Sequence, residues 1–362
     1  MTSIALGRSD VVVGVDTHKD EHVAVAIDGL GGRLGELSLA ANPAGYAQLL
    51  VWADQLGAVA VFGVEGTGSY GSGLARFLRR HGRKVVEVCR PPRKGERRLS
   101  GKSDTIDAEH AAREVLAGKA KSTPKLADGI VEAIRLVKIA RDSAVTAHSQ
   151  AMITLKATLV TASDELRAGI EPLTDFRLIQ ACAVLDESGD IADPAIAMRH
   201  LLASLARRWF ELHEEIKVHS RHLKKLTKTA APELVAAFGI GPDIAAEMLV
   251  TAGDNTDRLP SDAALAKMCG ACPIPASSGK TNGRHRLNRG GNRQANAALY
   301  RAIIVRMRWH PPTIAYVERR TAEGLSKREI IRCLKRYLAR EIYRLLPPPG
   351  TCAPPASAAE AA

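Results

Sequence analysis

VVVGVDTHKD, residues 11–20, is the stretch that determines the N-terminal fold. It opens with four valines around one glycine, and such an apolar run between polar residues is typical of a strand that is buried on both faces of a sheet. Asp16 follows at the end of the run, where a carboxylate can reach a ligand while the strand holds its backbone rigid. A single aspartate defines no site, so other acidic residues would have to converge on it.

The residues that follow have the pattern of a mixed sheet. Besides the opening stretch, the expected elements are strands at 21–28, 33–40, 58–64 and 84–89 and helices at 42–56 and 70–81. Asn42 and Pro43 fit the cap and the first position of the first helix. Three antiparallel strands followed by alternating helix and strand is the order of an RNase H-like (RuvC-like) α/β fold, which we expect here; actin-like sugar kinases share its opening.

Four acidic residues are expected to meet at one edge of this sheet. Asp16 and Glu65 each end a strand, and the two strands are expected to be neighbours. Asp104 and Asp107 stand three residues apart in a helix expected over 103–117, so both project from one face of its first turn. Clustered carboxylates need a counter-charge, and Mg²⁺ takes oxygen ligands together with substrate phosphates. The alternative is that Asp104 only caps its helix and that Glu65 is solvated.

The charge of the chain favours a polyanionic partner. The formal net charge is +12 and the sequence pI is about 9.6. Residues 279–344 contain 17 lysines and arginines against 4 acidic residues, so this segment accounts for the whole net charge. Because solvated basic faces usually carry compensating acids, we expect this segment to contact nucleic acid.

The scattered cysteines indicate a reducing environment, and the short apolar runs indicate that the chain has no membrane span. Six cysteines are scattered along the chain, and the first ten residues have no apolar signal core. No run approaches the roughly 20 apolar residues of a membrane span, so we expect a cytoplasmic, nucleoid-associated protein of bacterial type. Cys269 and Cys272 have the spacing of a zinc or redox pair, but zinc needs four ligands and no second pair accompanies them. We interpret their spacing as a coincidence.

Residues 123–230 are expected to form a long helical coiled-coil arm that begins after Thr123-Pro124. Apolar residues recur at alternating spacings of three and four in two helices, expected over about 128–168 and 195–228. They are Met152, Leu155, Leu159, Ala162 and Leu166 in the first helix, and Leu202, Leu205, Trp209, Leu212, Ile216, His219, Leu223 and Leu226 in the second. We interpret this seam as a contact between copies in a dimer or tetramer; folding back within one chain is the alternative.

Residues 231–346 are expected to form a mainly α-helical C-terminal domain, after a catalytic domain over 1–122 and the arm. The turn FGIGP, residues 238–242, is similar to a helix-hairpin-helix, whose glycines let backbone N–H groups approach a phosphate. A plain packing corner between two helices is the alternative. A last amphipathic helix is expected over 326–345, and the Pro/Ala-rich tail, 347–362, is expected to be disordered.

Two sets of motifs stand out along the chain. The N-terminal set is VGVDTHK (13–19), EGTGSY (65–70) and KSDTIDA (102–108). The second set is GIGP (239–242), PIPASSGK (273–280), RGGN (289–292) and ANAAL (295–299). The first set resembles the DEDD-type insertion-sequence transposases with a RuvC-like N-terminal domain, and the second is similar to the C-terminal domain of the same family. The sequence departs from the family at CGACP (269–273), where Gly-Leu-x-Pro is usual, and at Gln294-Ala295-Asn296, where Leu-Arg is common.

The resemblance implies a bridge-RNA-guided recombinase that moves its own DNA element. It implies that Asp16, Glu65, Asp104 and Asp107 hold Mg²⁺. It also implies that Ser278 attacks DNA and stays covalently linked to a strand end before rejoining; its neighbour Ser277 is the alternative. The implied partners are donor DNA, target DNA and a structured guide RNA from the element. The residues expected at nucleic acid are Lys102, Gly239, Gly241, Lys280, Arg284, Arg286, Arg289 and Arg293.

Three other functions stay open. A RuvC-like nuclease or junction resolvase would use the same acids with water in place of serine, and it would leave no protein–DNA adduct. A non-catalytic nucleic-acid-binding protein would have lost the acids, yet all four are present. An actin-like kinase would account for the glycines of residues 65–71 but not for the basic C-terminal segment, and ATP binding would distinguish it.

Overall fold

The structure is a computed structural model that describes residues 7, 10–89, 103–276, 285–288 and 290–348. The chain divides into two compact units. The N unit is Met1–Ala127 with Ala252–Ser261, and the C unit is Asp128–Thr251 with Asp262–Ala362. The chain therefore passes between the units three times. The three-domain division expected from the sequence stays a prediction, and residues 349–362 of the expected tail lie outside the described residues.

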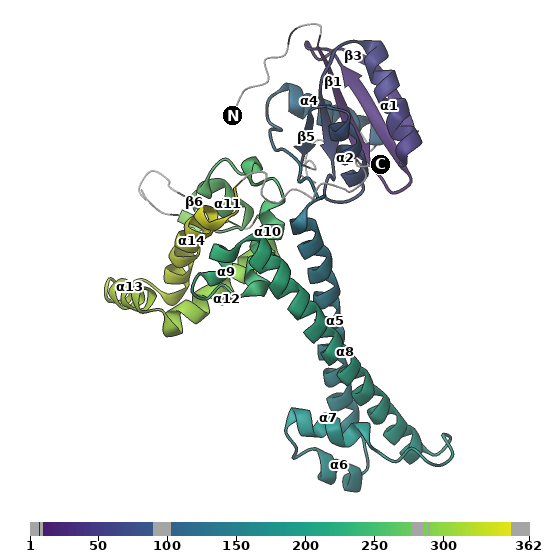
Figure 1. Cartoon of the computed structure of the whole chain (residues 1–362), viewed down its shortest axis with the longest axis vertical. Coiled ribbons are helices and arrows are strands. Elements are labelled where there is room, and N and C mark those ends of the chain that lie inside the picture. The colour runs from purple at the N-terminus through teal and green to yellow at the C-terminus, as the bar shows by residue number, and fades with distance from the viewer. Residues whose placement is uncertain (1–6, 8–9, 90–102, 277–284, 289, 349–362) are drawn as a thin grey trace, which may run out of the picture. The chain divides into compact units, whose positions relative to one another are not determined.

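The N unit is built on a five-stranded mixed sheet (Figure 1). Its strands are β1 (Val11–Thr17), β2 (Glu21–Ile27), β3 (Arg33–Ala40), β4 (Val59–Glu65) and β5 (Val85–Val88). They lie in the order β3-β2-β1-β4-β5. β2 pairs antiparallel with β1 and β3, whereas β4 runs parallel to β1 and β5. The expected meander and the parallel strands after it are confirmed, and the arrangement is consistent with an RNase H-like fold.

Helices cover both faces of this sheet (Figure 1). α1 (Pro43–Leu56) and α2 (Ser72–Arg80) share one face, and their core includes Val13, Leu49 and Leu74. α4 (Asp104–Leu116) packs on the other face through Ala108, Ala111, Ala112 and Val115. As predicted, the Asn42 side chain caps α1, accepting a hydrogen bond of 3.0 Å from the backbone N–H of Gly45.

Two glycines let α4 pack directly on the backbone of the sheet. Gly14 in β1 and Gly63 in β4 are register partners. A Cβ atom at Gly14 would lie 2.1 Å from the carbonyl oxygen of Ala108 and 2.3 Å from the backbone nitrogen of Ala112. A Cβ atom at Gly63 would lie 2.6 Å from Val115 Cγ2. Because neither position has room for a side chain, the register of α4 against β1 and β4 is closely fixed.

A segment from the C-terminal half of the sequence completes the N unit. It includes the short 3-10 helix η1 (Thr256–Arg258). The Asn255 side chain accepts a hydrogen bond from the Leu126 N–H (3.1 Å) and donates one to the Pro124 carbonyl (3.0 Å). Arg258 donates to the Thr123 carbonyl (3.0 Å) and pairs with Glu87 at 3.4 Å. The Thr123-Pro124 boundary seen in the sequence is thus the place where this returning segment binds.

Two long helices begin the C unit. They are α5 (Ile130–Leu159) and α8 (Pro194–Ala230), with α6 (Asp164–Ile170) and α7 (Asp175–Ala183) between them. Their shared core includes Leu155, Ile179 and Leu202. The helix expected over about 128–168 ends at Leu159, so the prediction is wrong beyond that residue; Ser163 and the acidic residues after it start α6. α5 and α8 pack on each other within one chain, which was the alternative interpretation of the seam.

The rest of the C unit is mainly helical. Its elements are α9 (Pro232–Ala236), α10 (Pro242–Ala252), α11 (Asp262–Met268), β6 (Pro273–Pro275), β7 (His285–Leu287), α12 (Arg293–Trp309), α13 (Pro311–Ala322) and α14 (Lys327–Leu345). The expected last helix is confirmed, with Ser326 and Glu329 forming a capping box. Among the described helices, none is long and apolar enough to cross a membrane.

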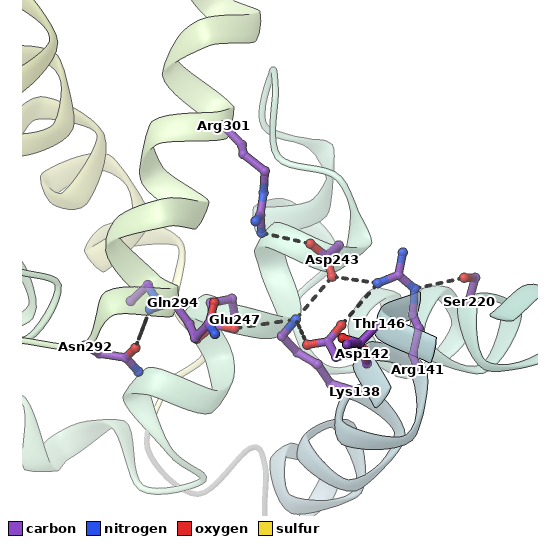
Figure 2. Close-up of polar contacts among 11 residues, drawn as sticks. Lys138, Arg141, Asp142, Thr146, Ser220, Asp243, Glu247, Asn292, Gln294 and Arg301 are labelled. Atoms are coloured by element: carbon purple, nitrogen blue, oxygen red, sulfur yellow. Dashed lines mark hydrogen bonds and ion pairs between the residues drawn. The ribbon is translucent and has the colours of Figure 1, made fainter. Parts of the chain in front are cut away.

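A network of charged residues joins α5 to α10 and α12 (Figure 2). Lys138 on α5 is only 9% exposed, and its Nζ lies 2.9 Å from Asp142, 3.2 Å from Asp243 and 3.5 Å from Glu247. Arg301 on α12 reaches Asp243 at 3.0 Å. Burial raises the pKa of Glu247, and the Lys138 charge opposes that rise. Because the paired charges offset each other, the network stabilises the junction only as long as it is complete.

Candidate functional site

Asp16 and Glu65 lie on the α4 side of the sheet, at the carboxyl ends of adjacent parallel strands. Gly14 and Gly63 face α4, and side chains alternate along a strand, so the residues two positions later face the same side. Both carboxylates are buried. The Thr17 hydroxyl donates a 3.0 Å hydrogen bond to the Glu65 carbonyl and ties the two strand ends together.

The first turn of α4 brings further acids to Asp16. The His18 Nε2 atom lies 3.0 Å from a carboxylate oxygen of Asp16 and 3.4 Å from one of Asp104. The ligand atoms of these three residues all lie within 4.8 Å of one another. Asp107 is near enough to influence the charge state of Asp16. The structure therefore brings Asp16, His18 and Asp104 together, while Asp107 lies in the same first turn of α4 and Glu65 ends the neighbouring strand.

The electrostatics of this cluster favour a cation. Burial raises the pKa of the Asp16 carboxyl; His18 opposes that rise, and Asp107 and Asp104 add to it. A buried carboxylate among other carboxylates is costly without positive charge nearby. Carboxylate oxygens and one imidazole nitrogen are donors that a divalent cation accepts, so the residues present fit a metal site.

His18 has no assigned role in the sequence-based interpretation of the site. It lies within the opening stretch, two residues after Asp16, where the chain has just left β1. Its side chain is half-exposed and contacts both acids. The signal that could have identified it is chemical, since histidine is a common metal ligand and it follows a strand-end aspartate directly.

The expected nucleophile lies outside the described residues. Strands β6 and β7 form a two-stranded hairpin in which Ile274 pairs with Arg286. Residues 277–284, which connect these strands, include Ser277, Ser278, Lys280 and Arg284 and are not described. Lys102 and Arg289 likewise lie outside the described residues. Arg286 and Arg293 are described and exposed.

The base of this hairpin is fixed by two glycine turns that pack on each other. Gly270 and Gly291 both have positive φ, and a Cβ atom at Gly291 would lie 2.6 Å from the Gly270 nitrogen. Asn292 caps α12 by accepting from the N–H groups of Gln294 and Ala295. Gly270 of the CGACP motif and Gly291 of the RGGN motif therefore lie against each other just before α12 begins.

Burial argues against a metal-binding thiolate at Cys269. The side chain is fully buried, and burial raises the pKa of its thiol to about 12. Zinc binds the thiolate form, which this environment disfavours.

The two glycines of the FGIGP turn have different surroundings. Gly239 has a φ of 75°, and its Cα faces α12, where a Cβ atom would lie 3.3 Å from the Ala302 carbonyl. A Cβ atom at Gly241 would meet nothing within 4 Å. Arg306 holds the turn by donating to the Phe238 carbonyl (2.8 Å) while forming a two-pronged pair with Glu341. Only Gly241 therefore offers open backbone to a phosphate.

Two family models match the chain. The model described as Transposase, for the DEDD type, matches residues 13–163, and the model described as Transposase IS116/IS110/IS902 family matches residues 231–318. Together they include the acidic cluster, the FGIGP turn and the hairpin. The matched models thus place the chain in the class of transposases, which are DNA-processing enzymes.

Proteins of known insertion elements are similar to this chain. The 44.8 kDa protein of insertion element IS116 from Streptomyces clavuligerus is 24% identical over 92% of this chain and 94% of its own length. The 43.6 kDa protein of IS110 from Streptomyces coelicolor is 28% identical over 164 residues, which span 45% of this chain and 40% of the relative. With both models matched in order, the chain is a transposase of the IS110/IS116 family.

Proposed function

We propose that the protein cleaves and rejoins DNA strands to move an insertion element, using a divalent metal, Mg²⁺, at the acidic cluster. The observation that carries the proposal is the convergence of Asp16, His18 and Asp104 within 4.8 Å at the strand ends of an RNase H-like sheet. Asp16, Glu65, Asp104 and Asp107 would hold the metal, with His18 as a further ligand. When bound, the metal would supply Lewis-acid polarisation of the scissile phosphate.

The Ser278 hydroxyl is the proposed nucleophile. Its oxygen would form a bond to phosphorus as the bond between phosphorus and the leaving sugar oxygen breaks, and the serine proton would pass to a base while the leaving oxygen is protonated. The product is a phosphoserine link that conserves the bond energy, so strands can be rejoined without ATP. Arg286 and Arg293, on the hairpin and the start of α12, would neutralise phosphate charge beside it.

The metal site is tested by Asp16→Asn. We expect this variant to lose strand cleavage at all Mg²⁺ concentrations while keeping its fold, because an amide cannot replace the buried carboxylate as a ligand. Asp175→Asn, at an exposed aspartate in α7, is the control and should cleave normally. Cleavage at the normal rate by Asp16→Asn would refute the metal site.

The serine step is tested by searching for a protein–DNA adduct that survives denaturation. The wild-type protein should form it, Ser278→Ala should not, and Ser277→Ala should. An adduct that persists in Ser278→Ala and is lost in Ser277→Ala would transfer the role to the neighbour. Strand exchange by Ser278→Ala at the wild-type rate would exclude Ser278 as the nucleophile.

A water-using nuclease is the second candidate function. It is favoured by one observation: the acid cluster is formed within the N unit by residues 16–107 alone. Under this alternative, Mg²⁺-dependent cleavage persists in Ser278→Ala and no adduct forms. The adduct assay therefore separates the two mechanisms.

We also propose that copies of the chain associate through the outer face of α5. Eight positions at alternating spacings of three and four are exposed and uncharged. They are Leu136, Ile139, Ser143, Thr146, Gln150, Ile153, Ala157 and Val160. A helix face of this length without charge is unusual for solvent and suits a second helix pair. Ile153→Lys should convert a dimer or tetramer to monomer in light scattering, whereas Val184→Lys, outside this face, should not.

A structured guide RNA is the last part of the proposal. The basic segment of residues 279–344 would hold such an RNA together with DNA. Nucleic acid that copurifies with the protein should then contain one discrete RNA from the element. A mixture of unrelated cellular RNA would contradict the guided mechanism and leave the metal site untouched.

A further inference from the structure

Three large apolar side chains are exposed together where the FGIGP turn meets α12. Phe238 is 44% exposed, Val305 is 42% exposed and Trp309 is 67% exposed. We call them the turn patch. Val305 and Trp309 stand four residues apart, on one face of α12. A Cβ atom at Gly239, next to Phe238, would lie 3.7 Å from Val305 Cγ1, so the turn and the helix are in contact at this point.

The turn patch is held rigidly. The Phe238 ring stacks on His310 with centroids 5.1 Å apart, and its carbonyl accepts a 2.8 Å hydrogen bond from the buried Arg306. Arg306 is in turn fixed by Glu341 on α14. An exposed apolar patch on such a rigid frame is more consistent with a binding surface than with a mobile loop.

The chemistry around the patch identifies the kind of partner. α12 carries no acidic residue, and two of its four arginines are already paired with acids of other helices. Arg308, adjacent to Trp309, is exposed and forms no ion pair with other residues that the structure describes. Gly241, at the start of α10, presents open backbone on the same turn. Flat aromatic rings beside positive charge suit nucleic acid whose bases are unpaired, because each base can stack on a ring while its phosphate meets a cation.

We infer that the turn patch is a stacking platform for unpaired bases, with Trp309 and Phe238 receiving bases and Arg308 meeting the backbone. The inference rests on the proposed function, since strand exchange passes through branched DNA with unpaired bases. It gives the FGIGP turn a second role: the turn would bind single strands with unpaired bases, in addition to contacting a phosphate of duplex DNA. The patch lies entirely within the C unit and needs no residue of the acidic cluster.

The test uses the full-length protein and two probes of equal length, a single-stranded oligonucleotide and its blunt duplex. The chain has three tryptophans, and Trp52 and Trp209 are less exposed than Trp309. We expect the single strand to quench Trp309 fluorescence. Trp309→Ala should weaken single-strand binding by on the order of tenfold, with duplex binding changed by less than about twofold. Trp309→Phe, which keeps a ring, should bind nearly normally.

Phe176→Ala, at a half-exposed aromatic residue of α7, is the matched control and should bind both probes normally. Equal loss for both probes in Trp309→Ala, or no loss for either, would overturn the inference. So would a smaller oligomer in light scattering with unchanged DNA binding, because the patch would then be a protein interface. In each of these outcomes, metal-dependent cleavage abolished by Asp16→Asn would leave the proposed function standing.

Discussion

Replacing Gly14 by alanine perturbs the contact that sets the position of the acidic cluster. The added Cβ atom would lie 2.1 Å from the Ala108 oxygen and 2.3 Å from the Ala112 nitrogen, and both are backbone atoms that cannot rotate away. Because real Cβ contacts essentially never fall below 3.0 Å, α4 must move away from β1 by about 1 Å. Asp104, one turn before Ala108, would move with the helix and away from Asp16.

Two magnitudes follow from this displacement. Overpacking a well-packed core costs about 1–3 kcal/mol, so the free energy of unfolding should fall by about 2 kcal/mol. A catalytic constellation tolerates about 0.5 Å of error, and a displacement of about 1 Å costs roughly 100-fold in rate. We therefore expect Gly14→Ala to remain folded and to lose about 99% of its metal-dependent DNA cleavage.

The assay combines urea denaturation, calorimetric titration with Mn²⁺ and cleavage of an end-labelled DNA substrate. Gly68→Ala is the control, because a Cβ atom at Gly68 would meet nothing within 4 Å. Normal metal affinity and cleavage in a folded Gly14→Ala protein would refute the reasoning. It would mean that α4 can shift without moving its carboxylates relative to Asp16.

Three further predictions concern single side chains. Lys138→Met should lower the free energy of unfolding by about 3 kcal/mol in urea, because it removes the cation that pairs with the buried Glu247. Lys156→Met, at an exposed pair, should cost less than about 1 kcal/mol. His18→Asn should weaken Mn²⁺ binding more than Mg²⁺ binding in calorimetry, because imidazole is a better ligand for Mn²⁺; an equal loss would exclude His18 as a ligand. Arg293→Gln should reduce the slope of log affinity for DNA against log salt by about 1, whereas Arg340→Gln, already paired with Asp262, should leave it unchanged.

The N-terminal fold was predictable because its strands and its first helix are marked by local sequence signals. The valine run of β1 and the cap at Asn42 are local signals, and both are found where expected. The acidic pair at the start of α4 was also predictable, since a spacing of three places both residues on one helical face. The contact of His18 with two acids was not, because it depends on how the chain turns after β1 rather than on any repeat.

No pattern in the sequence predicts that residues 252–261 belong to the N unit. Asn255 and Arg258 bind mainly backbone carbonyl and N–H groups, and such contacts produce no apolar periodicity in the sequence.

The helical arm shows a different limit of prediction from the sequence. A spacing of three and four identifies a seam but not the partner that fills it, and here α8 of the same chain fills the seam of α5.

The net charge counted along residues 279–344 differs from the charge that stays unpaired once the chain has folded. Arg301 pairs with Asp243, and Arg336 and Arg340 pair with Asp262, so acids outside the segment offset cations within it. A count along the sequence therefore overstates the charge that remains for a polyanion. Arg286 and Arg293, in contrast, form no ion pair with other described residues. The phosphate-binding surface that we propose is therefore limited to the hairpin and the start of α12; in the sequence, the proposed nucleophile lies between the two strands of that hairpin.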